Sequence, residues 1–419
     1  MRRKQLVLSL TFLCFSISLL GQQSENSALT LDQCISIAIL KNPLVLSSMN
    51  QYQASLARVS QAKAFPQPSI SYDSDLQTKF FNFKDCGESY FGLSQSVEFP
   101  GKRFLRGKIA ARESNEIMAD LDLLKLDIAL QVKNAFYNLL LSQEKLKYAQ
   151  QNLELSSDFQ KKAKLKFDAG DVAKVEVLRA SVEESKAFNE VKKASNEVKL
   201  AKAYLNFLLA RKKYSPLEIQ GELKRHVINL DLEGFTKRAL SFRPEMKKIS
   251  FSLERGNLQK KQAFMSYLPD FELGVSKHHI VGEGKWWDVT LSFPIPLFFW
   301  QPKKGEIAEA QANINSINNK VEHIKNSILL EVEEAYTNAL TADNQIKLFE
   351  GDILTQAEEV YRMFLISYQE GEIGSIELID ARRTLLEARK SYADALYNYD
   401  VALAALEKSV GQKLEGEVK

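Results

Sequence analysis

A run of 62 residues without glycine or proline, from Lys108 to Ala169, constrains this chain more than any other feature. An uninterrupted helix of that length would be about 93 Å long, far beyond the helices of ordinary globular domains. A second segment carries apolar residues at steps of three and four, namely Ile314, Ile317, Val321, Ile324, Ile328, Val332, Ala335 and Ala339. This spacing is typical of helices that pack side by side as coiled coils, and its alanines predict close packing. We expect a local bend at Gly351, which interrupts the second segment.

The chain contains two similar copies of one unit, residues 31–211 and 232–412. At an offset of 201 residues, Gly170, Asp171, Val172, Val175 and Glu176 match Gly371, Glu372, Ile373, Ile376 and Glu377. A helical pattern resumes after each glycine, which predicts two helical hairpins with tips at about 167–173 and 368–375. The polar residues 212–231 predict a connector between the copies.

Each copy also predicts a shorter helix, at about 44–64 and 245–266, and a returning helix, at 171–215 and 375–410. A shorter and a returning helix together have about the length of the long helix. Stacked end to end, the two could run alongside it.

Each copy predicts two strands ahead of its long helix, at about 69–80, 89–99, 270–279 and 286–296. Apolar and polar residues alternate along them, which suits a membrane β-barrel with lipid outside and water inside. Four strands cannot close a barrel, because open edges in lipid leave backbone groups unpaired. Three chains would supply twelve strands. From the alternation alone, the hairpins of a soluble sandwich remain an alternative.

Aromatic residues gather at the predicted strand ends, at Trp286, Trp287, Phe298, Phe299 and Trp300. A membrane barrel carries such a girdle at the lipid–water interface, although aromatic residues that cap an ordinary core would look similar. The duplication and the long helices favour the membrane interpretation.

The amino terminus predicts a secretory signal over residues 1–21, in which Arg2, Arg3 and Lys4 precede an apolar run. Residues 22–419 then form one mature unit, whose 53 basic and 53 acidic residues balance, so nothing indicates a nucleic-acid partner. Cys14 lacks the small residue before it that lipidation requires. Cys34 and Cys86 have neither the number nor the spacing of a disulfide framework or a metal site.

No phosphate-binding loop, nucleophile motif or zinc-ligand spacing occurs in the chain. His278 and His279 form its one histidine pair, which we expect to be plain surface at a strand end or in a loop. We therefore predict no enzymatic activity, no catalytic residues, no cofactor and no bound metal.

Over its full mature length the chain resembles the TolC family of outer-membrane efflux proteins. The resemblance lies in the Phe-Asp-Ala-Gly-Asp-Val segment at 167–172, its counterpart at 368–373, and Phe99-Pro100-Gly101-Lys102-Arg103. It implies a mainly α fold with a small β-barrel portion: a homotrimer with a 12-stranded barrel in the outer membrane and a 12-helix α-barrel through the periplasm. The implied partners are a periplasmic adaptor, an inner-membrane pump of the RND or ABC type, and lipid.

The function implied is a passive conduit that exports small solutes, drugs or divalent metal cations, from a Gram-negative cell. The Phe99–Arg103 segment favours the divalent-cation branch of the family. Two alternatives remain, a periplasmic coiled-coil adaptor and the outer-membrane component of a type I secretion system.

In that family, tyrosine, arginine and carboxylate side chains narrow the tunnel mouth. The resemblance places the tyrosine at Tyr368 and the carboxylates at Glu176, Glu377 and Asp380, whereas Ile373 occupies the position of the arginine. The family's ionic latch is therefore absent. Three copies of each carboxylate would form acidic rings that attract cations.

An alternative role for Glu176 and Glu377 is to stabilise the exposed amides at the start of the returning helix. Asp171 and Glu372 are expected to cap those helices. Together with Gly170 and Gly371 they mark the hairpin tips, where the resemblance implies docking of the adaptor.

Overall fold

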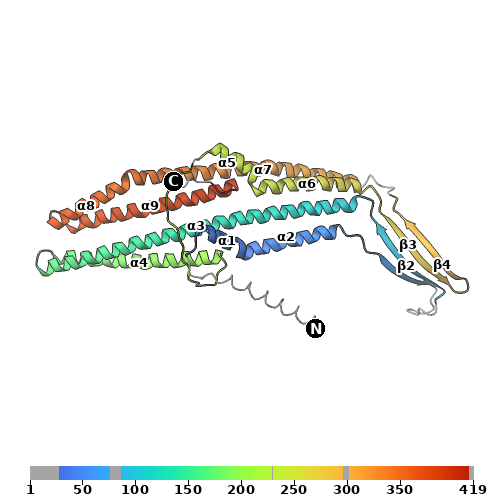
Figure 1. Cartoon of the computed structure of the whole chain (residues 1–419), viewed down its shortest axis with the longest axis horizontal. Coiled ribbons are helices and arrows are strands. Elements are labelled where there is room, and N and C mark those ends of the chain that lie inside the picture. Colours follow the sequence, from blue (N-terminus) through green and yellow to red (C-terminus); the bar gives the residue numbers. More distant parts are fainter. Residues whose placement is uncertain (1–27, 76–85, 229, 296–301, 415–419) are drawn as a thin grey trace, which may run out of the picture.

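The chain is a long rod of helices with a four-stranded sheet at one end (Figure 1). The structure, a computed structural model, describes residues 28–75, 86–228, 230–295 and 302–414. The predicted signal, the end of the first predicted strand, and Phe298, Phe299 and Trp300 lie outside the described residues. No helix within these ranges is both long enough and apolar enough to cross a membrane.

The two copies repeat one order of elements: two short helices, two strands, a long helix and a returning helix. The first copy contains α1 (Leu31–Lys41), α2 (Pro43–Ala62), β1 (Ser69–Asp75), β2 (Glu88–Val97), α3 (Lys102–Asp168) and α4 (Lys174–Leu208). The second contains α5 (Leu232–Phe242), α6 (Pro244–Met265), β3 (Phe271–Ile280), β4 (Gly284–Ser292), α7 (Pro302–Leu348), α8 (Leu354–Glu370) and α9 (Ser375–Val410).

The long helix α3 has 67 residues and is about 100 Å long. It begins six residues before the predicted start at Lys108 and includes Gly107. The helix continues through Gly107 because a single glycine costs a helix only about 1 kcal/mol. Here the side chain of Lys63 lies against the glycine, with its Cγ 2.7 Å from where a Cβ would be.

The bend expected at Gly351 is a π-helical turn, Phe349–Ile353, between α7 and α8. Glycine weakens a helix at this point, and the turn accommodates one extra residue there. The predicted coiled-coil seam of α7 is confirmed at its most buried positions, Ile328, Val332 and Ala339, each at most 2% exposed.

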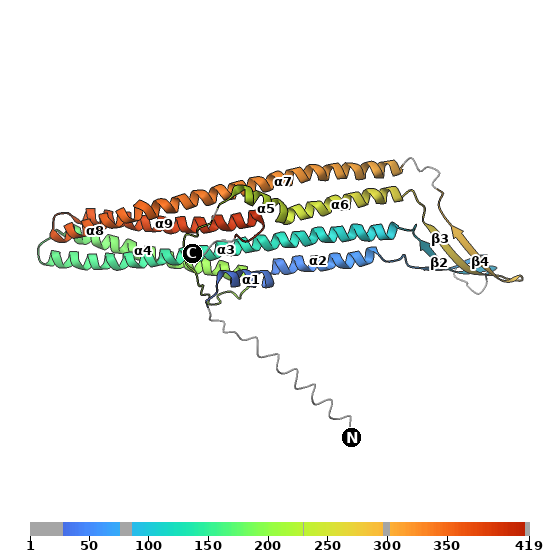
Figure 2. The same ribbon diagram turned by 45° about the horizontal axis from the view of Figure 1, so that its top comes forward.

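The short and returning helices stack end to end alongside the long helix, as predicted (Figures 1 and 2). In each copy the two short helices are separated by one residue that precedes a proline, Asn42 or Arg243. Proline disfavours a helical backbone at the residue before it, so the first helix ends there. The same two residues tie the stack together. The Asn42 amide donates to the Leu208 carbonyl at 3.1 Å, and the Arg243 guanidinium donates to the Ser409 carbonyl at 3.2 Å.

Alanines allow close packing of the first hairpin. Ala180, Ala187, Ala194 and Ala201 recur at every seventh position of α4, and each is at most 5% exposed. Larger side chains fill the core of each copy near the middle of the rod, such as Phe136 and Leu205 in the first and Phe235 and Tyr399 in the second. There the predicted connector also pairs with the segment just before α1, through a β-bridge between Ile219 and Leu29.

The sheet is antiparallel in the order β1-β2-β3-β4, so the two copies share one sheet through the β2–β3 pair. Phe91 lies opposite Tyr72 and Lys277, and Val275 lies opposite Leu93 and Val289. Residues opposite one another share a face, and alternate residues of a strand point to opposite faces. The outer edges of β1 and β4 have no strand partner within the described residues.

Candidate functional site

One face of the sheet is mostly apolar and uncovered, with Lys277 lying between Phe91 and Trp287. Its residues have exposed fractions from 45% to 79%: Ile70, Tyr72, Phe91, Leu93, Leu273, Val275, Trp287, Val289 and Leu291. Isolated exposed apolar side chains are common in soluble proteins, but a contiguous surface of this kind marks contact with a membrane or a partner.

The opposite face is polar, with small or acidic side chains: Ser71, Asp73, Glu88, Ser94, Glu272, Ser276, Asp288, Thr290 and Ser292. Trp286 lies on this polar face, opposite His278, whereas Trp287 lies on the apolar face. The expected aromatic girdle therefore cannot include both tryptophans, because adjacent residues of a strand point to opposite sides.

His278 is not the plain surface residue that we expected. Its ring stacks on Tyr90, with the centroids 4.0 Å apart, and its side chain is only 14% exposed. Its two ring nitrogens lie 3.7 Å from carboxylate oxygens of Glu88 and Asp288. The cluster depends on the register of β2 with β3 and of β3 with β4, so no local signal in the sequence could have revealed it. His279 lies on the opposite face and contacts the Gly284 carbonyl at 3.1 Å.

Both hairpin tips turn at the predicted glycines. Gly170 and Gly371 have φ values of +88° and +82°, in the left-handed region that favours glycine. At the second tip, the Glu372 amide donates to the Ser367 carbonyl at 2.9 Å. This hydrogen bond reaches five residues back along the chain, as is typical of a helix that ends in a left-handed residue.

The expectation that Asp171 and Glu372 cap the returning helices is wrong. The N-cap residues are Ala173 and Gly374, and neither makes a side-chain capping bond. Each acidic residue directly follows its tip glycine, so it belongs to the turn and lies two residues before the cap position. Both are exposed at the end of the rod.

Replacing Gly371 with valine is expected to destabilise the tip by about 1 kcal/mol or more, because a β-branched residue is strained at this positive φ. The free energy of unfolding in detergent measures the effect. Gly305→Val is the matched control, since Gly305 lies in helix α7 with open space around it and no positive φ. Equal stability of the two variants would contradict a turn that depends on Gly371.

The structure separates the four predicted pore-entrance residues into two groups. Glu377 and Asp380 are exposed and lie three residues apart in α9, on one face of the helix. Asp380 forms an ion pair with Arg383, which offsets part of its charge. Glu377 therefore contributes the larger uncompensated charge.

Glu176 and Tyr368 instead lie between the two hairpins. The Glu176 carboxylate accepts a hydrogen bond from the Ser375 hydroxyl of the other hairpin and pairs with Arg179 at 3.1 Å. Tyr368 packs 5.6 Å from the Phe159 ring, with the Lys166 ammonium 5.0 Å from its own ring centre. Burial raises the pKa of Tyr368, and the negative charge of Glu176 raises it further.

Sequence reasoning missed Ser375. It is the first residue of α9 and is only 2% exposed. In the sequence, the one sign of its role is a hydroxyl-bearing residue in the first helical turn after a hairpin tip. The structure shows that this hydroxyl links the second hairpin to the first.

The described residues also bear on the question of a metal site and of a reactive thiol. Across the described ranges, no group of three or more His, Cys, Asp or Glu side chains is arranged to hold a metal ion. Cys34 is fully buried, and burial raises the pKa of its thiol to about 11, which disfavours the reactive thiolate.

Comparisons with known proteins agree with these features. A family described as "Outer membrane efflux protein" matches residues 34–211 and 236–412, one match in each copy. The cobalt-zinc-cadmium resistance protein CzcC of Cupriavidus metallidurans is 23% identical over 403 residues, which cover 92% of this chain and 90% of that protein.

Two solved outer-membrane channels share the fold. The Neisseria gonorrhoeae channel MtrE superposes with a TM-score of 0.76 at 17% identity, covering 92% of this chain and 89% of that one. The Campylobacter jejuni channel CmeC gives a TM-score of 0.75 at 16% identity, covering 96% and 92%.

Proposed function

Since this chain belongs to the outer membrane efflux protein family and is a channel subunit of an efflux system, we propose that three copies assemble into one continuous conduit. Their sheets would close a twelve-stranded barrel in the outer membrane, and their helical hairpins would form a tunnel through the periplasm. Residues 1–21 would direct export of the chain and be removed.

The incomplete sheet supports this assembly most directly. It carries an uncovered apolar face, a polar face, and edges at β1 and β4 that lack a strand partner in the described chain. In lipid, each unpaired backbone group costs several kcal/mol, so the edges must pair with other copies. The apolar face would then contact lipid, and the polar face would line a water-filled lumen.

We propose divalent cations as the cargo. The proposal is supported by the similarity to a cobalt-zinc-cadmium resistance protein and by the acidic residues of the polar face, Asp73, Glu88, Glu272 and Asp288. Three copies of each carboxylate would attract cations along the path. A conduit works best when no single site binds strongly, and within the described residues no group of three or more such side chains is arranged to hold a metal ion.

The hairpin tips are the proposed docking site for a periplasmic adaptor and an inner-membrane pump. Gly170, Asp171, Gly371 and Glu372 are all exposed there. Membership of the efflux family, two hairpins per chain and the two-faced sheet argue against an adaptor as the function of this chain itself.

Conductance in a planar lipid bilayer tests the conduit. Purified trimers should produce discrete channel openings and should resist extraction from membranes by alkaline carbonate. Correctly folded trimers that never conduct, or a chain that carbonate releases, would contradict the proposed function.

Replacing Glu377 with glutamine and Asp380 with asparagine is expected to lower the preference of the channel for cations, because both acidic rings at the mouth would be lost. The reversal potential under a salt gradient measures this preference. The control is Glu233→Gln on α5, whose carboxylate is 80% exposed and pairs with Lys237. An unchanged reversal potential in the double variant would exclude Glu377 and Asp380 from the conduction path.

A further inference from the structure

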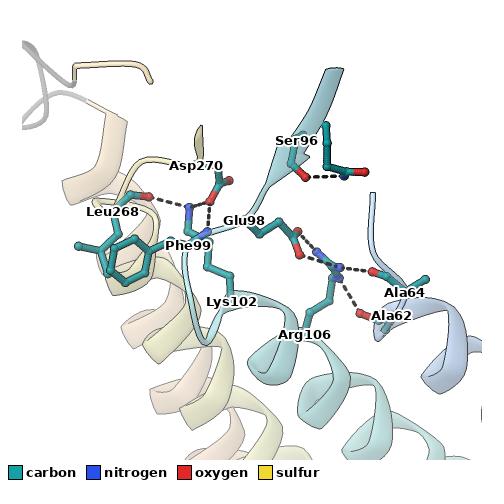
Figure 3. A network of polar contacts seen from close by, with 10 residues as sticks. Ala62, Ala64, Ser96, Glu98, Phe99, Lys102, Arg106, Leu268 and Asp270 are labelled. Carbon is teal, nitrogen blue, oxygen red and sulfur yellow. Dashed lines mark hydrogen bonds and ion pairs between the residues drawn. The ribbon is translucent and has the colours of Figure 1, made fainter. Parts of the chain in front are cut away.

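The segment Phe99–Arg103 lies where the sheet meets the helices, and Figure 3 shows the polar contacts of Lys102 and of the nearby Arg106. The Lys102 ammonium binds Asp270 at 2.8 Å and the Leu268 carbonyl at 2.7 Å, so it ties α3 to the chain segment before β3. The Arg106 guanidinium binds Glu98 and the Ala62 carbonyl. Both cations are therefore neutralised within the chain.

Arg103 differs from these two neighbours. Its guanidinium lies 3.6 Å from the centre of the Phe65 ring and has no carboxylate partner among the described residues. A guanidinium that packs on an aromatic ring and shares its N–H groups with no carboxylate can donate them to a phosphate.

Basic residues outnumber their acidic partners where α2 ends and α3 begins. Lys102 and Arg106 pair with Asp270 and Glu98, whereas Lys63 and Arg103 have no acidic partner in the described chain. The Lys108 ammonium lies 4.4 Å from the centre of the Phe104 ring and likewise has no acidic partner in the described chain. This surface favours an anion over a neutral or zwitterionic group.

A cavity of about 500 Å³ lies beside Arg103. Aromatic and apolar side chains form most of its wall: Phe65, Val97, Phe99, Pro100 and Phe104. Glu98 also lines it, and its carboxylate is paired with Arg106. Phe65 and Phe104 are 71% and 64% exposed, so this chain leaves both rings largely uncovered. Val97 belongs to the apolar face of the sheet, so the cavity continues that face to the point where the helices begin.

We propose that this cavity binds one anionic phospholipid per chain at the membrane surface nearest the helices. The Arg103 guanidinium would hold the lipid phosphate, and Phe65 and Phe104 would hold the first part of an acyl chain that continues over the apolar sheet face. Aromatic and basic side chains anchor membrane proteins at this depth. The proposal rests on the proposed function, because the sheet must lie in the membrane.

The proposal is limited to the first copy. At the start of α7 the sequence reads Pro302, Lys303 and Lys304, so no arginine occupies the position of Arg103, and residues 296–301 lie outside the described residues. One lipid per chain, or three per trimer, is the expected stoichiometry.

Native mass spectrometry of delipidated trimers, titrated with phosphatidylglycerol, tests the site. Three bound lipids per wild-type trimer are expected, and Arg103→Gln should weaken binding about tenfold or more, because a charged hydrogen-bond donor is lost. Phe65→Ala should also weaken binding. The matched control is Arg58→Gln on α2, whose side chain pairs with Glu113 outside the cavity and whose loss should not change the affinity.

Three outcomes would overturn the proposal. These are equal affinity of the wild type and Arg103→Gln for phosphatidylglycerol, displacement of the lipid by millimolar inorganic phosphate, and cross-linking of Phe65→Cys to a neighbouring subunit in trimers without lipid. The last outcome would mean that a second copy fills the cavity. Phosphatidylcholine, which is zwitterionic, should bind more weakly than phosphatidylglycerol. Equal binding of the two would be a fourth outcome that overturns the proposal, because the site is proposed for an anionic lipid.

Conductance separates this proposal from the conduit itself. Arg103→Gln trimers should conduct as the wild type does, because the site lies on the lipid side of the sheet. Conducting trimers that do not bind phosphatidylglycerol would refute only the lipid site. Wild-type trimers that bind the lipid but never conduct would refute only the conduit.

Discussion

Replacing Val289 with arginine is expected to prevent stable insertion of the sheet into the outer membrane, whereas the same change at the adjacent Thr290 should be tolerated. Val289 lies on the apolar face of β4 and is 79% exposed, and Thr290 lies on the polar face. An arginine that faces lipid near the middle of the bilayer costs a β-barrel about 2–4 kcal/mol. A trimer would incur this cost in each of its three subunits.

The amount of protein in the carbonate-resistant outer-membrane fraction measures the difference. Thr290→Arg is the matched control, because it adds the same side chain one residue away on the opposite face. Its channels should also conduct cations less well, since the added positive charge would face the lumen. Equal recovery of the two variants from the membrane fraction would contradict the assignment of the two faces.

Replacing Arg243 with alanine is expected to lower the free energy of unfolding by about 3 kcal/mol. Arg243 is 2% exposed and lies where α5 ends and α6 begins. Its guanidinium pairs with Glu245, lies 2.8 Å from a Glu331 carboxylate oxygen, and donates to the Ser409 carbonyl. The substitution would leave two carboxylates and a helix-terminal carbonyl without their shared cation. Because Glu331 is half exposed, water offsets part of the loss, and we expect the lower end of the range for buried pairs.

Denaturant unfolding of the detergent-solubilised protein measures the change. Lys237→Ala on α5 is the control: the Lys237 side chain is 75% exposed and pairs with the similarly exposed Glu233, so its loss should change stability by less than about 1 kcal/mol. A loss below 1 kcal/mol in Arg243→Ala would show that the stack of α6 on α9 does not depend on this arginine.

The sequence alone determined the features that depend on neighbouring residues. The absence of glycine and proline from Lys108 to Ala169 indicated the long helix, and Gly170 and Gly371 indicated its turns, because each depends on local backbone preferences. Alternation in the strands indicated a two-faced sheet. The number of strands then indicated that the chain is incomplete alone, since four strands cannot enclose a lumen.

Only the tertiary structure decided which distant side chains meet. The β2–β3 register places Tyr90 against His278, and the approach of the hairpins brings Glu176 to Ser375. The packing around α3 likewise pairs Lys102 with Asp270 while Arg103 has no carboxylate partner in the described chain. Tyr90 and His278 are 188 residues apart in the sequence, and Glu176 and Ser375 are 199 apart. Local periodicity reports the face on which a side chain lies, whereas contacts between copies depend on how whole helices and strands are aligned.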